Sequence, residues 1–250
     1  MKNNLLILIM LIFCKTGLAI SSQKAPIYVK FGPDFLWSQS DNFFIQRMHS
    51  IEGTLNPSIS SGSLNDGKWT GNVALGLTYP FSSTWHLSPE ISFLPLGNYS
   101  KSFNPFLTGP YEGDDIINTF NATMKGNVVA AVINIDYLIN KRYSIYVAPG
   151  LGVANVKTNN VLNYQSSDDE TNLLMISNKR RSNFSPQVSI GIKYAMTSTI
   201  VFDLGVNYIW LGTIPFGSYS NDPDGYTATT VAVSNAYLLG PKLNLVYYFG

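Results

Sequence analysis

The residues best equipped for chemistry stand together in one segment, His86-Leu87-Ser88-Pro89-Glu90. An imidazole, a hydroxyl and a carboxylate are the groups that acyl transfer by a serine nucleophile requires. In a strand, alternate side chains share a face, so His86, Ser88 and Glu90 would all point the same way. The outer two would stand about 13 Å apart, because a strand rises about 3.3 Å per residue. The trio is therefore a catalytic candidate that one strand alone cannot assemble.

Charged residues occupy the same face in the other predicted strands. The set whose phase points inward consists of Lys30, Asp34, His86, Glu90, Asp136, Lys193, Asp203 and Lys242. Both signs occur, and an unpaired charge shielded from water is costly. We expect these side chains to form a structural network of ion pairs.

Two acidic runs offer oxygen ligands for a divalent cation, Asp168-Asp169-Glu170 and the pair Asp222 and Asp224. Neither has the ligand count of a calcium loop, so we interpret them as solvated charge. The sequence contains no phosphate-binding glycine pattern, nucleophile elbow or zinc-ligand spacing. We expect no cofactor and no metal.

Period-two alternation of apolar and polar residues is the pattern that must position these groups. The chain ends with Leu243, Leu245, Tyr247 and Phe249 alternating with polar Lys242 and Asn244. Segments of this kind are about as long as a tilted strand that crosses a bilayer. They cover residues 27–35, 68–79, 85–96, 119–138, 142–156, 183–195, 199–211 and 231–249. The sequence predicts an all-β fold, an eight-stranded antiparallel transmembrane β-barrel.

The predicted connections alternate in length. Segments 36–67, 97–118, 157–182 and 212–230 are long, whereas 80–84, 139–141 and 196–198 are short. Short periplasmic turns and long surface loops are typical of outer-membrane barrels. The apolar residues Phe43, Phe44, Ile45, Met48 and Ile51 in the first long segment leave ten strands open as an alternative. The third long segment, 157–182, contains Lys179-Arg180-Arg181, which we expect to be an exposed protease site.

The predicted strands carry large apolar residues on one face and small or polar residues on the other. In residues 143–153, for example, Tyr143, Ile145 and Val147 oppose Ser144 and Ala148. Lipid suits the first face, and a narrow lumen filled by side chains suits the second. Aromatic residues gather near both ends of the strands and predict two interfacial girdles.

Composition agrees with a membrane protein. Only 12% of the 250 residues are charged, against roughly 25% in soluble domains. After the first twenty residues no apolar run is long enough for a spanning helix, which leaves a closed barrel, because lipid satisfies no backbone hydrogen bonds. The net charge of +1 becomes −1 if Lys2 and Lys15 are removed, which argues against nucleic acid as a partner.

The amino terminus resembles an export signal. Lys2 is followed by an apolar run over residues 5–13 and by small residues at Gly17 and Ala19. We expect a signal peptide over residues 1–19 and a barrel domain over residues 20–250. A lipoprotein signal is the alternative, with Cys14 lipidated, but bulky Phe13 precedes this single cysteine.

Two strands and the carboxyl terminus carry a resemblance to known proteins. The segments Tyr146-Val147-Ala148-Pro149-Gly150-Leu151-Gly152-Val153 and Ser185-Pro186-Gln187-Val188-Ser189-Ile190-Gly191-Ile192-Lys193-Tyr194, with the ending Tyr247-Tyr248-Phe249, resemble the opacity and OmpA-type small outer-membrane barrels of Gram-negative bacteria. The resemblance implies insertion by the barrel-assembly machinery, which recognises the aromatic last strand. Gly250 after Phe249 departs from that signal.

Two enzyme families give narrower resemblances. His86 and Ser88 resemble the His-x-Ser pair of lipid A deacylase barrels, but in those enzymes the pair faces lipid near the outer leaflet. Here His86 follows a short periplasmic turn and its phase points inward. The second family is the omptin-like proteases, which resemble a ten-stranded barrel with an Asp pair and an Asp-His pair. In this sequence no Asp pair accompanies His49.

We therefore expect a non-enzymatic, monomeric surface protein of the outer membrane that crosses it several times. Its expected roles are adhesion, surface antigen or envelope integrity, with outer-membrane lipids and lipopolysaccharide around it and a host ligand bound by its loops. A small pore and a lipid A deacylase remain the alternatives.

Overall fold

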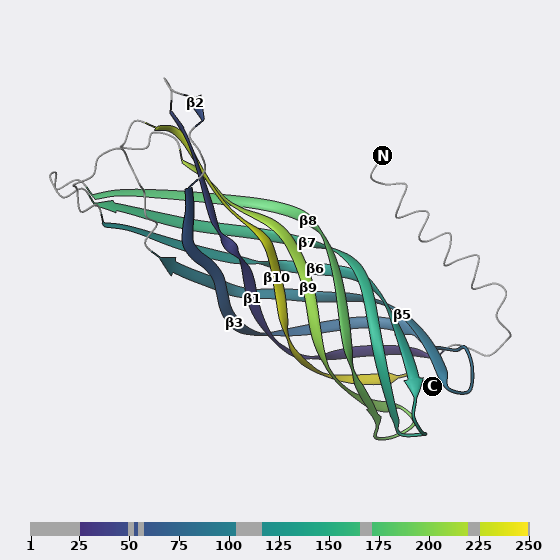
Figure 1. Ribbon diagram of the computed structural model, residues 1–250. Coiled ribbons are helices and arrows are strands. Elements are labelled where there is room, and N and C mark those ends of the chain that lie inside the picture. The colour runs from purple at the N-terminus through teal and green to yellow at the C-terminus, as the bar shows by residue number, and fades with distance from the viewer. Residues whose placement is uncertain are drawn as a thin grey trace.

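Eight long antiparallel strands form a closed barrel in the computed structural model (Figure 1). The structure describes residues 26–49, 53–54, 58–103, 117–165, 172–219 and 226–249. The wall consists of β1 (Ile27–His49), β3 (Ser58–Leu77), β5 (Trp85–Phe103), β6 (Ile117–Leu138), β7 (Tyr143–Gln165), β8 (Asn172–Ala195), β9 (Ile200–Tyr219) and β10 (Tyr226–Tyr248). These strands pair in chain order, and β10 pairs with β1 to close the ring. The predicted eight-stranded barrel is confirmed.

Two further strands have only two residues each and do not enlarge the wall. Gly53–Thr54 (β2) pairs with β1, and Tyr79–Pro80 (β4) pairs with β5. β1 includes Phe43, Phe44, Ile45 and Met48, the apolar residues that left ten strands open as an alternative. Within the described residues, no helix has the length and apolarity to cross a membrane. The predicted signal peptide, Ile51 and Gly250 lie outside the described residues.

The prediction of four long loops was wrong for most of their length. β1 continues to His49 and β3 begins at Ser58, so much of the predicted loop 36–67 is strand. The segments 97–118, 157–182 and 212–230 are likewise shortened by β5 to β10. Beyond the bilayer both faces of a strand can be polar, so the hydrogen-bonded ladder continues where the hydropathy alternation ends.

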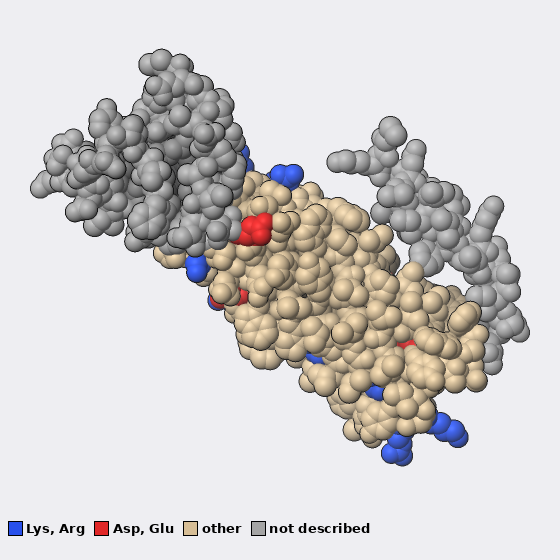
Figure 2. All heavy atoms as spheres, in the orientation of Figure 1, with Lys and Arg blue, Asp and Glu red and all other residues tan. Residues whose placement is uncertain are grey.

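The strand phase separates a lipid-facing exterior from the interior. On β7 the outward residues are apolar from Tyr143 to Val153, which matches the 9–11 residues that a tilted strand needs to span a bilayer. Asn155 follows on the same face. On the side of the molecule seen in Figure 2, uncharged residues cover most of the middle, and the projecting charged side chains gather toward the two ends.

The barrel divides into two sheets at the end away from the chain terminus marked C (Figure 1). β8 pairs with β9 only over Gln187–Ala195, and β3 pairs with β5 only over Val73–Gly76. Beyond these short ladders, β5, β6, β7 and β8 stay paired as one sheet, and β9, β10, β1 and β3 as another. We call this part the cap and the two unpaired boundaries the seams.

Local backbone irregularities follow the end of the β8–β9 ladder, whose last pair is Gln187 with Ile209. Gly212 has a φ of 73° and pairs with Ala236, and the preceding Asn235 has a φ of 49° at a shift of the β9–β10 register. Glycine reaches this left-handed conformation without steric cost, and asparagine tolerates it. β9 bends inward here. Thr158 Oγ1 and Asn160 Nδ2 on β7 then donate hydrogen bonds to the carbonyls of Pro215 and Phe216, at 2.8 and 2.7 Å.

An apolar core fills the space between the two sheets of the cap. Each sheet contributes fully buried side chains, among them Tyr99 and Met124 from one, and Leu211, Ile214 and Leu238 from the other. The prediction of a small and polar inward face was therefore wrong for this part of the barrel. Small and polar residues such as Ala148 and Ser189 occupy inward positions nearer the short turns.

Candidate functional site

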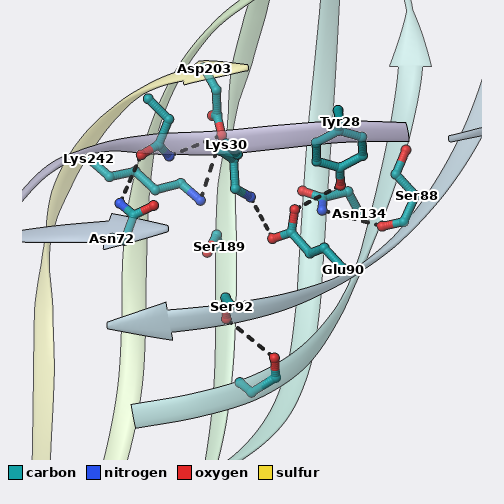
Figure 3. A network of polar contacts seen from close by, with 12 residues as sticks. Tyr28, Lys30, Asn72, Ser88, Glu90, Ser92, Asn134, Ser189, Asp203 and Lys242 are labelled. Carbon is teal, nitrogen blue, oxygen red and sulfur yellow. Dashed lines mark hydrogen bonds and ion pairs between the residues drawn. The ribbon is translucent and has the colours of Figure 1, made fainter. Parts of the chain in front are cut away.

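The polar interior near the short turns holds seven of the eight predicted inward residues, of which Lys30, Glu90, Asp203 and Lys242 are labelled in Figure 3. The eighth, His86, is half-buried. Lys30 on β1 and Glu90 on β5 form an ion pair across the lumen, with Nζ 2.5 Å from Oε1. The hydroxyl of Tyr28 donates to the other carboxylate oxygen of Glu90 at 2.8 Å. Both oxygens of this buried carboxylate therefore have a partner, as a charge in low dielectric requires.

A second ion pair joins Lys193 on β8 to Asp136 on β6, with Nζ 2.6 Å from Oδ1. Two ammonium groups lie near the ring of Tyr146 on β7. The Nζ of Lys193 is 5.0 Å from its centroid, and that of Lys242 is 5.3 Å away. An aromatic face within about 6 Å attracts a cation, so Tyr146 adds to the balance of charge.

The remaining charges are linked mainly through amides. Lys242 Nζ lies 4.0 Å from Asp203 Oδ2, which also accepts from Asn244 Nδ2 at 3.3 Å. Asp34 has no ion pair with any cation among the described residues. Its oxygens accept from Asn72 Nδ2 at 2.6 Å and from Asn207 Nδ2 at 2.9 Å.

Several partners in this cluster were missed by the reasoning from sequence. Tyr28, Asn72, Tyr146, Asn207 and Asn244 all have the inward phase, which was the available signal. A search for charges alone overlooks them, because an amide or a phenol has no charge at neutral pH but supplies the donors that a carboxylate needs.

The structure does not bring the catalytic candidates together. Ser88 Oγ lies 3.0 Å from Thr78 Oγ1, and Glu90 is bound to Lys30 and Tyr28. Among the described residues no hydrogen bond joins His86 to either of them. The three groups keep the strand spacing of about 6.6 Å per step, so no nucleophile–base pair is formed.

The other candidates give no site within the described part of the chain. Asp168, Asp169, Glu170, Asp222 and Asp224 lie outside the described residues, and the side chain of His49 is also not described. Among the residues that are described, no group of three or more His, Cys, Asp or Glu could hold a metal ion.

The predicted assembly signal lies on the lipid side of β10. Leu243, Tyr247 and Phe249 are exposed and Leu245 is half-buried. The backbone N–H of Phe249 donates to the carbonyl of Ile27 at 2.8 Å, at the junction of the last strand with the first.

Comparison with known proteins agrees with this architecture. A family model described as the outer membrane protein beta-barrel domain matches residues 50–237. The chain belongs to the outer membrane protein β-barrel domain family. Its localisation is the outer membrane, as predicted, and the expected kinship with small Gram-negative outer-membrane barrels is confirmed.

Outer membrane protein PagN of Salmonella typhimurium is 31% identical over 188 residues, which cover 70% of this chain and 72% of PagN. Among solved structures, Ail of Yersinia pestis in complex with the heparin analogue sucrose octasulfate is 12% identical with a TM-score of 0.41, covering 91% of this chain and all of Ail. OprG of Pseudomonas aeruginosa is 12% identical with a TM-score of 0.38, covering 91% of this chain and 98% of OprG. The two solved structures are too distant to carry a function to this chain.

In this outer membrane β-barrel, both parts of the interior are occupied by side chains. The charged network crosses the lumen near the short turns, and the apolar core fills the cap. Chemically, the network can hold strands together by ion pairs, and no nucleophile–base hydrogen bond is formed among its described residues. Surfaces outside the lumen are therefore where a ligand has access.

Proposed function

We propose that this protein is a non-enzymatic, adhesin-like surface protein whose binding surface is the cap and the connections at its tip. The observation that carries the proposal is the length of the strands. On β7 the apolar band ends at Val153, but the strand continues to Gln165, which is about 40 Å further along the strand. A rigid platform thus extends beyond the lipid, and such scaffolds position loops for contact.

The filled lumen argues against a pore. Eight strands leave an interior just wide enough for side chains to fill, and here ion pairs and apolar residues fill it. The separation of His86 from Ser88 and Glu90 argues against a deacylase. Planar-bilayer conductance and mass spectrometry of lipid A in expressing cells test these two alternatives.

The decisive experiment replaces the connections at the cap. The segments 104–116, 166–171 and 220–225 are each exchanged for a two-residue Asn-Gly turn, and expressing bacteria are scored for binding to epithelial cells and matrix proteins. A matched control exchanges Thr197 and Ser198, in a short turn at the opposite end, for Asn-Gly. We expect at least one cap variant to lose binding while it keeps the heat-modifiable electrophoretic mobility of a folded barrel. Undiminished binding by all three folded variants would contradict the proposal.

A further inference from the structure

A groove with a cavity volume of about 670 Å³ lies on the outer face of β6, β7 and β8. Six of its ten lining residues form two rows of side chains, each contributed by the three strands, and the others are Leu96, Gly126, Val156 and Arg181. One row consists of Lys125, Lys157 and Arg180, and the other of Asn127, Asn155 and Ser182. None of the residues lining the groove is an aspartate or a glutamate.

The three cations of the first row are direct neighbours across the sheet. Lys125 is paired in register with Lys157, and Lys157 with Arg180. Adjacent strands lie about 4.8 Å apart, and like charges directly opposite one another are destabilising. In the described part of the chain no carboxylate forms an ion pair with these three residues. The row thus has an uncompensated charge that an anion would neutralise.

The second row, Asn127, Asn155 and Ser182, is held in place by hydrogen bonds among its own side chains. Asn155 Nδ2 donates to Asn127 Oδ1 at 3.1 Å, and Ser182 Oγ donates to Asn155 Oδ1 at 2.7 Å. These bonds order one wall of the groove before any ligand is present. An ordered wall lowers the entropy cost of binding.

The next row toward the short turns is apolar and faces outward. It consists of Val129, Val153 and Phe184, which are paired in register and are 42, 45 and 59% exposed. Along the strands, this face therefore presents an apolar row, then a row of uncharged polar side chains, then a row of cations. The cations stand about 13 Å along the strands from the apolar row. A ligand that satisfies all three rows carries an anion at one end and hydrocarbon at the other.

We propose that this groove is a binding site for the phosphate of an outer-leaflet glycolipid, lipopolysaccharide. Its phosphate oxygens contact Lys125, Lys157 and Arg180, and its acyl chains lie against Val129, Val153 and Phe184. The planar guanidinium of Arg180 can bind two phosphate oxygens, and the lysines add point charges. A sulfated polysaccharide could use the cations but has no hydrocarbon for the apolar row. The proposal depends on the outer-membrane location and is independent of the adhesive role.

The test measures lipopolysaccharide binding by the folded protein in detergent, using native mass spectrometry and titration. The variant K125Q/K157Q/R180Q removes the cation row. The control K101Q/K141Q/R142Q removes the same charge elsewhere. We expect the first variant to bind lipopolysaccharide at least tenfold more weakly and the control to bind like the unmodified protein. Enzymatically dephosphorylated lipopolysaccharide should bind the unmodified protein as weakly as the intact lipid binds the variant.

Equal lipopolysaccharide binding by both variants would overturn the proposal. It would also be overturned if heparin, and not lipopolysaccharide, lost its binding in K125Q/K157Q/R180Q, since the row would then serve a soluble polysaccharide. If the triple variant does not fold, the single variants R180Q and R180K replace it. We then expect R180Q to weaken binding and R180K to retain most of it, and equal binding by R180Q and the unmodified protein would overturn the site.

Discussion

Lys193 on β8 and Asp136 on β6 form an ion pair of 2.6 Å that passes over the strand between them. Neighbouring strands are held by backbone hydrogen bonds, but this contact joins strands that are not neighbours. It fixes the separation of β6 and β8 across the inside of the wall. The side chains of the lumen thus act as internal crosslinks of the barrel.

Removing one partner of this pair should destabilise the barrel. We expect Lys193→Leu or Asp136→Leu to lower the free energy of unfolding by about 3 to 5 kcal/mol, because the remaining charge is left buried. Urea titration in lipid vesicles measures it. The double variant should lose less than the sum of the two single variants. Unchanged midpoints for both single variants would show that the pair is not structural.

Substitution of Asp203 should destabilise the barrel about as much as substitution of Asp136. It is fully buried and is surrounded by Lys242 and the amide of Asn244. We expect Asp203→Leu to cost a few kcal/mol, since Lys242 then loses its ion-pair partner. The same titration applies, with Ser198→Ala in an exposed turn as a control that should leave the midpoint unchanged. A shift no larger than that of the control would contradict this assignment.

The cost of a charge on the outer face should depend on depth. Val147 lies in the middle of the outward band of β7, so we expect Val147→Arg to cost about 2 to 4 kcal/mol. Asn159 is exposed beyond the band on the same face, and Asn159→Arg should cost about 0 to 1 kcal/mol. Equal costs at the two positions would mean that the membrane boundary is misplaced.

Truncating a side chain in the core of the cap should also lower the stability of the protein. Leu211 is fully buried between the two sheets, and we expect Leu211→Ala to cost about 2 to 5 kcal/mol through lost burial and a cavity. Calorimetry or urea titration measures the loss. Thr123→Ala, on the outward face of β6, serves as the control. A loss below 1 kcal/mol at Leu211 would show that the core of the cap is loosely packed.

Cysteine labelling can test the orientation. Cys14 lies in the predicted signal peptide, so single introduced cysteines would be the only thiols of the exported chain. We expect a membrane-impermeant maleimide to label Asn178→Cys on intact cells, and Ser198→Cys only after the outer membrane is opened. The opposite result would invert the topology. This replaces the expected tryptic cut at Lys179-Arg180-Arg181, because these residues lie in β8 and pair with β7.

The sequence predicted the wall of the barrel but not the cap. Alternation between lipid and lumen is a signal only where the two sides of a strand meet different solvents, as at Val147 and Ala148. Beyond Val153 the ladder of β7 and β8 continues through polar residues such as Asn159 and Asn178. Leu211 and Leu238 continue the inward phase of predicted strands, but that they meet depends on the bend of β9 at Gly212.

The sequence predicted which charged residues of the candidate site point into the lumen, but it did not predict which of them pair. The inward phase identifies Lys30 and Glu90, but only the shear of the barrel decides which strands bring their side chains together. The amides on Asp34 show the limit of reasoning from charge, because Asn72 and Asn207 come from strands far apart in the chain.

The two seams divide the barrel into two parts that are stabilised in different solvents, lipid and water. The wall near the short turns is stabilised by lipid on its outside, whereas much of the core of the cap is shielded from water by its own two sheets, as in a soluble sandwich. Backbone ladders connect the two parts, yet they have different reasons to remain folded. Thinning or replacing the lipid should loosen the wall first, and cooling should weaken the cap first, because burial from water loses strength at low temperature. Hydrogen exchange measured under both conditions would show two protected regions that exchange separately.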